Sequence, residues 1–294
     1  MSLKIAVIGG DLRQLYAANR LMEQGYGVSL YGFSDSDCPG VHPCEELSRA
    51  LEDADCVVLP MPVSRDKETL LTPLWEKKLP LSQLFDNVKY YQTVFCGMAE
   101  KLPLCYQDGV VDYAEDESFL LKNAYLTAEA AVEIAISQTS YSLREASILI
   151  TGYGRIGKFL ARMLSSLGAK VFVAARRSYQ LAEIELEGHI PVSYEHLSAI
   201  LPEADLVFNT VPHQIFDWQR VAQLKTDCLF VDLASLPGGI VKEAADQRGV
   251  RLIHALSLPG KVAPISSGKI VADTIVRLLS VKFRDKDRKN DGTV

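Results

Sequence analysis

The sequence lacks long apolar runs, closely spaced cysteines and a marked excess of charge of one sign. No apolar run approaches the roughly 18 residues that a membrane-spanning helix requires. The N-terminus enters an apolar, strand-like segment at once, without the pattern of a signal peptide. The six cysteines include no C-x-x-C pair, which argues against a disulfide framework or a zinc site. We therefore expect a cytoplasmic protein with reduced thiols.

Charge and motif content exclude further classes of function. The formal net charge is −6 and no basic stripe occurs, so nucleic acid is not an expected partner. The five histidines show no metal-ligand spacing, and no G-x-S-x-G, P-loop or H-E-x-x-H motif is present. We predict no metal site. With 294 residues, 48% of them hydrophobic, the chain suits two domains of ordinary size.

A glycine-rich turn between two strand-like segments is the central motif of the chain. The run 148–151 leads into Gly152, Gly154 and Gly157, and an amphipathic segment and the apolar run 170–175 follow. This is the pattern of a βαβ dinucleotide-binding unit, in which the glycines permit a tight turn, close approach of a pyrophosphate and close helix packing. Glycines kept for packing alone are the alternative. The residues expected to bind the cofactor here are Gly152, Tyr153, Gly154, Arg155, Ile156 and Gly157.

The end of the second strand indicates which dinucleotide is bound. NAD-binding units usually carry Asp or Glu there, which accepts a hydrogen bond from the ribose 2′-hydroxyl. This sequence has Ala175, Arg176, Arg177 and Ser178 instead. Arginine cannot accept that bond but pairs with a 2′-phosphate, and serine adds a hydroxyl donor. We therefore predict NADP rather than NAD. Two solvated arginines at a strand end are the alternative.

Strand-like runs continue to alternate with helical segments after the fingerprint. They occur at 190–192, 206–209, 228–231 and 251–253, which makes about six strands in this half of the chain, the number of a dinucleotide-binding domain. The carboxyl ends of parallel strands meet at one edge of the sheet, beside the cofactor. We therefore expect two loops at that edge to bind the cofactor as well, through Asn209, Thr210, Val211, Pro212, Asp232, Leu233 and Ala234.

The N-terminal part repeats the βαβ pattern without the full fingerprint. An apolar run at 4–8 ends in Gly9 and Gly10, but the third glycine is missing. Asp11 at a helix start would repel a phosphate and suits an N-cap. We predict a Rossmann-like domain that does not bind a nucleotide. Its further strands are expected at 55–59, 93–96 and 104–106, followed by an acidic, solvated segment at 112–117.

These patterns predict an α/β protein with two Rossmann-like doubly wound parallel-sheet domains and a cleft between them. The apolar helix expected at 123–136 marks the domain boundary. The predicted domains are an N-terminal substrate domain at 1–125 and an NAD(P)-binding domain at 126–266. A last helix at 267–283 would return to complete the first domain. The charged segment 284–294 lacks apolar periodicity, and we expect it to be frayed or disordered.

Candidates for substrate binding are few. Arg13 is expected just inside a helix that starts at a strand's carboxyl end, where it could pair with a carboxylate. Lys261 is a second cationic candidate, with a solvated lysine as the alternative. Ser266 and Ser267 are expected to cap the last helix, whose N-terminus could bind an anion, so Ser267 is a third candidate. Two histidines near the predicted loops could act as acid or base, or could be merely packed: His213 and His254. No catalytic residue is identified.

Several segments together resemble the family of the dipicolinate synthase A subunit. They include Gly9-Gly10-Asp11-x-Arg13, Asn123-x-x-x-Thr127-Ala128-Glu129, the fingerprint and, most specifically, Leu258-Pro259-Gly260-Lys261-Val262-Ala263-Pro264. The likeness covers nearly the full chain. More distantly, the two-domain layout is similar to that of 2-hydroxyacid dehydrogenases, alanine dehydrogenase and adenosylhomocysteinase.

The resemblance implies a role in the mother cell of a sporulating bacterium, together with the flavoprotein-like B subunit of dipicolinate synthase. It implies NADP-dependent dehydrogenation, at a CH–CH donor, of a dihydrodipicolinate-type intermediate of the lysine pathway to dipicolinate (pyridine-2,6-dicarboxylate). The cations Arg13 and Lys261 suit such a dicarboxylate, but no catalytic residue carries over from the family. The alternatives are another NAD(P)-dependent oxidoreductase of a small carboxylated substrate, an adenosylhomocysteinase-like lyase, and a non-catalytic nucleotide sensor. The sequence also leaves open whether the chain forms a homo-oligomer.

Overall fold

The computed structural model describes residues 3–35 and 42–291, and the chain divides into two compact units. Unit 1 comprises residues 1–123 and 263–294, and unit 2 comprises residues 124–262. The first boundary falls inside helix α5 (Glu117–Gln138), which is longer at both ends than the helix expected at 123–136. None of the described helices is long and apolar enough to cross a membrane.

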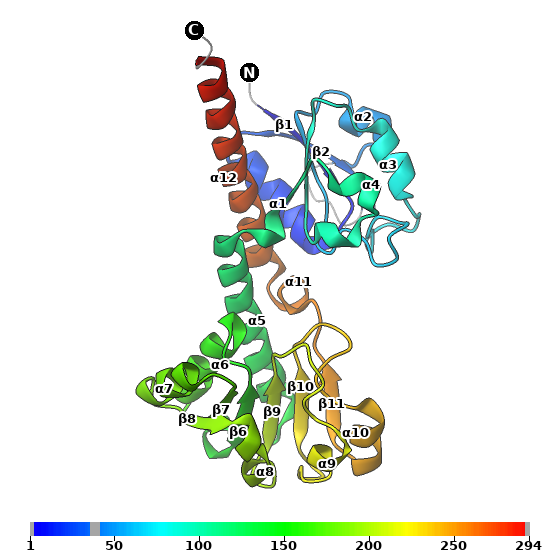
Figure 1. Ribbon diagram of the computed structural model, residues 1–294. Helices are drawn as coiled ribbons and strands as arrows, with labels where there is room; N and C mark the ends of the chain where they lie inside the picture. The colour runs from blue at the N-terminus through cyan, green and yellow to red at the C-terminus, as the bar shows by residue number, and fades with distance from the viewer. Residues whose placement is uncertain (1–2, 36–41, 292–294) are drawn as a thin grey trace. The chain divides into compact units, whose positions relative to one another are not determined.

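Unit 1 is built on a five-stranded parallel sheet in the order β2-β1-β3-β4-β5. Its strands are β1 (Lys4–Ile8), β2 (Gly27–Tyr31), β3 (Cys56–Val58), β4 (Thr93–Cys96) and β5 (Val110–Asp112). The connecting helices are α1 (Leu12–Glu23), α2 (Leu47–Leu51), α3 (Leu81–Asn87) and α4 (Leu104–Gln107) (Figure 1). Successive side chains of a strand point to opposite faces, so Ile5 and Val7 of β1 enter one hydrophobic core, and Ala6 and Ile8 enter another.

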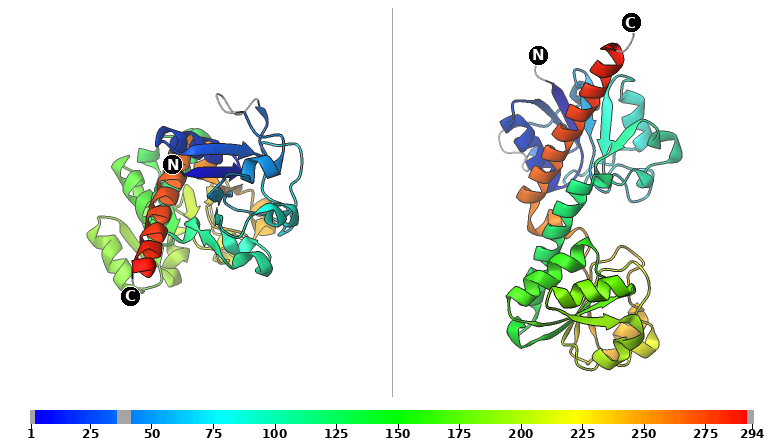
Figure 2. Two further views of the ribbon diagram at one scale, coloured as in Figure 1. Left: turned by 90° about the horizontal axis from the view of Figure 1, so that it is seen from above. Right: turned by 60° about the vertical axis from the view of Figure 1, so that its left-hand side comes forward.

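The last helix, α12 (Pro264–Asp291), packs against α1 within unit 1 (Figure 2). Gly268 permits this close crossing, because a Cβ at that position would lie 2.7 Å from the carbonyl oxygen of Arg13 and 2.8 Å from the amide nitrogen of Ala17. Val271 and Ile275 of α12 are buried in the same core. The sequence pattern predicted an end at residue 283 and a frayed tail at 284–294. The helix instead runs to Asp291, and residues 292–294 lie outside the described residues.

Two expectations for unit 1 are wrong. Residues 104–106 form the start of α4 and not a strand, and Pro103, whose φ is −55°, is the N-cap of this helix. The ring of Tyr106 then stacks on Phe85 with centroids 4.3 Å apart. The segment 112–117 is not simply solvated, since Tyr113 is fully buried and donates a 3.1 Å hydrogen bond to the carbonyl of Leu59.

Unit 2 is built on a six-stranded parallel sheet in the order β11-β10-β9-β6-β7-β8. Its strands are β6 (Ser147–Thr151), β7 (Lys170–Ala175), β8 (Ile190–Ser193), β9 (Leu206–Asn209), β10 (Leu229–Asp232) and β11 (Arg251–His254). Its further helices are α6 (Arg155–Ser166), α7 (Ser178–Leu186), α8 (Leu197–Ile200), α9 (Trp218–Val221), α10 (Lys242–Arg248) and α11 (Leu258–Val262). This is the doubly wound order, with its switch point between β6 and β9. The predicted α/β class with two Rossmann-like domains is confirmed.

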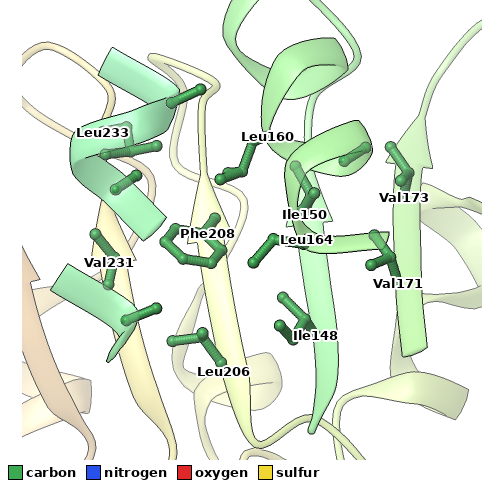
Figure 3. Close-up of a cluster of buried hydrophobic side chains, with 14 of the residues drawn as sticks. Ile148, Ile150, Leu160, Leu164, Val171, Val173, Leu206, Phe208, Val231 and Leu233 are labelled. Atoms are coloured by element: carbon green, nitrogen blue, oxygen red, sulfur yellow. The ribbon is translucent and has the colours of Figure 1, made fainter. Parts of the chain in front are cut away.

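Each face of the unit 2 sheet has its own hydrophobic core. Ile148 and Ile150 of β6 pack with Leu160 and Leu164 of α6 on one face (Figure 3). Leu149, which lies between the two isoleucines, belongs to the core on the other face. The strand is thus buried on both sides, and the turn that follows it is held at a fixed place on the edge of the sheet.

Candidate functional site

The fingerprint turn joins β6 to α6 at the carboxyl edge of the unit 2 sheet. Gly152 has φ +96°, a conformation that residues with a side chain rarely adopt. A Cβ on Gly157 would lie 2.1 Å from the carbonyl oxygen of Gly152, so only glycine lets the helix pass the turn. Gly154, the N-cap of α6, differs: a Cβ there would meet nothing within 4 Å. The backbone therefore requires glycine at Gly152 and Gly157, whereas the space beside Gly154 is open to a ligand.

A pocket of about 510 Å³ lies at this edge, beside the switch point between β6 and β9. Of the residues predicted to bind the cofactor, it is lined by Gly152, Tyr153, Gly154, Ala175, Arg176, Thr210, Val211 and Pro212. Among the histidine candidates it is lined by His213. It is also lined by residues that the sequence did not single out, namely Gln180, Tyr194, Gln214, Ile215 and Arg220. Tyr194 follows β8 directly, so the rule that ligands bind beyond the carboxyl ends of strands could have found it. No sequence signal pointed to Arg220.

The charges around the pocket are of one sign. None of the residues that line it is a carboxylate. Arg176 is exposed, and within the described part of the chain it forms no ion pair. Arg177 does not line the pocket; its Nη1 donates a 2.9 Å hydrogen bond to the hydroxyl of Tyr179. Ser178 is the first residue of α7 and is exposed. Of the two predicted arginines, Arg176 is therefore the one that faces this pocket.

Burial raises the pKa of both Tyr153 and Tyr194 above the ordinary value of about 10, so both phenols stay neutral well above pH 7. The Tyr153 ring lies under Lys158, whose Nζ is 5.0 Å from the ring centroid and 2.5 Å from Oε1 of Glu183. These contacts fasten α6 to α7 beside the pocket.

Asn209 and Asp232 hold the neighbouring loops together and do not line the pocket. Both side chains are fully buried. Nδ2 of Asn209 donates to Oδ1 of Asp232 at 2.8 Å, and Oδ1 of Asn209 accepts from the hydroxyl of Thr151 at 2.7 Å. Oδ2 of Asp232 accepts from the amide of Gly239 at 2.7 Å. Because the polar atoms of both side chains are committed within the protein, contact with a cofactor falls to other parts of these loops, such as Thr210, Val211 and Pro212.

The remaining predicted cofactor residues of unit 2 also lie away from the pocket lining. Arg155, Ile156 and Gly157 occupy the first turn of α6, and Leu233 and Ala234 follow β10 and are buried. His254 ends β11, with Nδ1 4.0 Å from Oδ2 of Asp232 and a side chain that is 32% exposed. Direct roles for these residues stay predictions.

The turn after β1 in unit 1 is filled by the protein itself. The amide of Gly10 donates to the carbonyl of Leu71 at 2.8 Å, and a Cβ on Gly9 would lie 2.8 Å from Cδ2 of Leu70. Asp11 is the N-cap of α1, as expected, and accepts from the amide of Arg13. These contacts occupy the space and the amides that a pyrophosphate would need.

The guanidinium of Arg13, which was expected to pair with a substrate carboxylate, is buried and bonded within the protein instead. It is 3% exposed, its Nε and Nη2 donate to Asp11 at 2.9 and 2.8 Å, and Nη2 also donates to the carbonyl of Met61 at 2.6 Å. Burial by itself would lower the pKa of Arg13, but the Asp11 carboxylate holds it above its ordinary value. The residue thus ties the helix start to the loop after β3.

The other two substrate candidates differ in exposure. Lys261 lies on α11, is exposed, and forms no ion pair with any described residue. Ser267 is 3% exposed and lies inside α12, where its amide donates to the carbonyl of Ala263 at 2.9 Å. Because α12 begins at Pro264, neither Ser266 nor Ser267 caps it, and that expectation is wrong.

Known proteins match both units of the chain. Residues 4–104 match the N-terminal domain of the dipicolinate synthase A subunit, and residues 124–248 match the NAD binding domain of D-isomer specific 2-hydroxyacid dehydrogenases. The dipicolinate synthase A subunit of Bacillus subtilis (strain 168) is 30% identical over 285 residues, which make up 95% of this chain and 96% of that protein. The chain belongs to the dipicolinate synthase A-subunit family.

Solved structures agree with membership of the A-subunit family. The crystal structure of the dipicolinate synthase A subunit from Bacillus halodurans has a TM-score of 0.84 at 28% identity, and the match covers 94% of this chain and 97% of that one. An L-alanine dehydrogenase, with a TM-score of 0.65 at 17% identity over 94% and 89% of the two chains, shares the fold. Unit 2 is therefore a nicotinamide-nucleotide-binding domain of the dehydrogenase type, and the family supports an oxidoreductase.

Proposed function

We propose that this chain is the NADP-dependent dehydrogenase subunit of a dipicolinate synthase, which oxidises a dihydrodipicolinate-type intermediate to dipicolinate. Membership of the A-subunit family supports the reaction class. The relatives' names designate one lettered component of a larger enzyme, which supports a B-type partner subunit. By the same likeness we propose that it acts in the cytoplasm of a sporulating mother cell.

One observation carries the choice of NADP: the pocket beside the fingerprint is lined by Arg176 and by no carboxylate. An NAD site needs an acceptor for the ribose 2′-hydroxyl, and a 2′-phosphate needs a cation. The open backbone at Gly154, at the positive end of α6, suits the pyrophosphate. Arg176 would then hold the 2′-phosphate by a charge-assisted hydrogen bond.

The proposed reaction removes one hydride and one proton from a dihydropyridine ring. When bound, NADP⁺ would accept the hydride. The ring C–H bond breaks with its electron pair, a second hydrogen leaves as a proton, and the products are the aromatic dicarboxylate, NADPH and H⁺. Because aromatisation favours the products, much of the catalysis can come from positioning the ring. The chain's part is to orient the reactants: Lys261, the exposed candidate, would bind a carboxylate, and the Asn209–Asp232 network would hold the loops still.

Reconstitution tests the reaction. The purified chain, with and without the B-type partner, is incubated with dihydrodipicolinate and NADP, and NADPH absorbance and dipicolinate are followed. We expect NADPH and dipicolinate to form in equal amounts. No NADP reduction in either mixture would remove the dehydrogenase function and leave a nucleotide sensor.

Binding of the two dinucleotides tests the cofactor. Arg176→Ala should weaken NADP by roughly 10- to 100-fold, the loss of one charge-assisted hydrogen bond, and leave NAD unchanged. Arg177→Ala is the matched control, since it removes an adjacent arginine that contacts Tyr179 instead. The preference for NADP is wrong if the wild-type chain binds NAD at least as tightly.

Substrate kinetics test the proposed carboxylate contact. Lys261→Ala should raise KM for the dicarboxylate several-fold, because it removes the cation that we propose as the carboxylate's partner. An unchanged KM would exclude Lys261 from substrate binding.

A further inference from the structure

Two arginines from distant parts of the chain line the same pocket. Arg176 follows β7, and Arg220 belongs to α9. Within the described residues neither guanidinium forms an ion pair, and no carboxylate lines the pocket. Two uncompensated positive charges that face one hollow repel each other, and a bound anion relieves that repulsion.

Neutral main-chain carbonyls hold the guanidinium of Arg220 in place. Its Nη1 donates to the carbonyl of Ile215 at 2.7 Å, and its Nη2 donates more weakly to the carbonyl of Tyr194 at 3.4 Å. Its own amide is fixed by the N-cap Asp217, whose Oδ1 accepts at 2.9 Å. A guanidinium has five N–H donors, so these bonds orient the group without using all its donors or cancelling its charge.

Tyr194 lines the same pocket as the two arginines. Burial raises the pKa of Tyr194, and the charges of Arg176 and Arg220 both act in the opposite direction. Both positive charges therefore act on the same phenol. Since Tyr194 lines the pocket together with both arginines, its hydroxyl adds a further hydrogen-bonding group to that wall.

We propose that Arg220 is a second determinant of cofactor specificity, which binds the 2′-phosphate monoester of NADP together with Arg176. The inference rests on the proposed NADP site and goes beyond it, because it assigns a role to a residue outside the fingerprint and the strand end. The competing role for Arg220 is to fasten the loop at Ile215 to Tyr194, which would affect every nucleotide alike.

Arg220→Gln separates the two roles, because glutamine keeps an N–H donor for the loop and loses the charge. Binding of four ligands is measured by calorimetry: NADP, NAD, adenosine 2′,5′-bisphosphate and 5′-AMP. We expect about 10-fold weaker binding of the two ligands with a 2′-phosphate and a change of less than about 2-fold for the other two. Arg248→Gln is the matched control, since Arg248 also bonds a carbonyl, that of Leu224, and does not line the pocket.

The outcomes separate this inference from the proposed function. Equal weakening of all four ligands, or an unchanged preference for the 2′-phosphate, overturns the role of Arg220 while the NADP site stands. A wild-type chain that does not prefer NADP to NAD overturns the site itself. A third measurement uses the double variant with Arg176→Gln: if both arginines bind one phosphate, their effects are not additive.

Discussion

Replacing Asp232 by asparagine should destabilise unit 2 strongly, although the change in size is negligible. Oδ1 of Asp232 accepts from Asn209 and from the amide of Ala234 at 3.2 Å, and Oδ2 accepts from the amide of Gly239 at 2.7 Å. Asparagine has one oxygen and one NH₂ group. In either orientation the NH₂ therefore faces a donor, and the better orientation sacrifices the bond to Gly239.

The magnitude follows from that loss. A hydrogen bond to a charged group contributes about 1.5–3 kcal/mol, and a buried N–H left without a partner costs about 1–3 kcal/mol. Relief from burying the carboxylate offsets part of this, so we expect the free energy of unfolding of unit 2 to fall by about 3 kcal/mol. For a unit of this size that corresponds to a fall in Tm of roughly 10 °C.

Fluorescence can follow unit 2 alone. The chain has two tryptophans, Trp75 in unit 1 and Trp218 in unit 2. In a Trp75→Phe background, urea unfolding monitored at Trp218 should show the loss. Asp246→Asn is the control, because Asp246 forms an exposed pair with Lys242 and its loss should cost less than about 1 kcal/mol. If Asp232→Asn costs no more than the control, the carboxylate does not hold these loops.

Three further predictions concern glycine, a buried amide and a buried histidine. Gly157→Ala should destabilise unit 2 by at least about 3 kcal/mol, because its Cβ would lie 2.1 Å from the carbonyl oxygen of Gly152. Gly154→Ala should leave the Tm nearly unchanged and abolish nucleotide binding. Equal Tm values for the two variants would contradict this. Gln14→Met should raise the free energy of unfolding of unit 1 by about 1–3 kcal/mol, and with it the Tm, since neither polar atom of the buried Gln14 side chain has a partner among the described residues. A lower Tm would show that the amide is bonded in solution. Burial lowers the pKa of His189, so the folded unit binds fewer protons than the unfolded chain and loses stability as pH falls below about 6.5. The dependence of Tm on pH should therefore be weaker in His189→Phe. An unchanged slope would show that His189 does not cause this dependence.

The parts of the fold that follow from local patterns could be predicted from the sequence. The apolar runs that form β6 and β7 place side chains in the cores on both faces of the sheet. The spacing of the glycines between them already indicated that each has a different steric role. Local pattern failed at 104–106, where an apolar triplet after a proline suits a strand or a helix and packing against Phe85 decides.

The candidate site was predictable only in part, because two of its features depend on tertiary structure. Arg220 reaches the pocket because the chain after β9 turns back toward Tyr194, and no spacing in the sequence encodes that approach. Arg13 is the opposite case. Its position at the carboxyl end of β1 was predicted, but its charge is taken up by Asp11 two residues away.

The continuity of the two units has a consequence for biosynthesis. Unit 2 is an uninterrupted segment, 124–262, whereas unit 1 needs residues 263–294 as well as 1–123. As the chain leaves the ribosome, unit 2 can therefore fold while the face of unit 1 that receives Val271 and Ile275 is still bare. Unit 1 contains the N-terminus, yet it cannot be completed before unit 2 has been synthesised. A released chain that ends at residue 262 would contain every residue of unit 2 but would leave open the apolar surface of unit 1 that Val271 and Ile275 cover, so its first unit should be the one that aggregates.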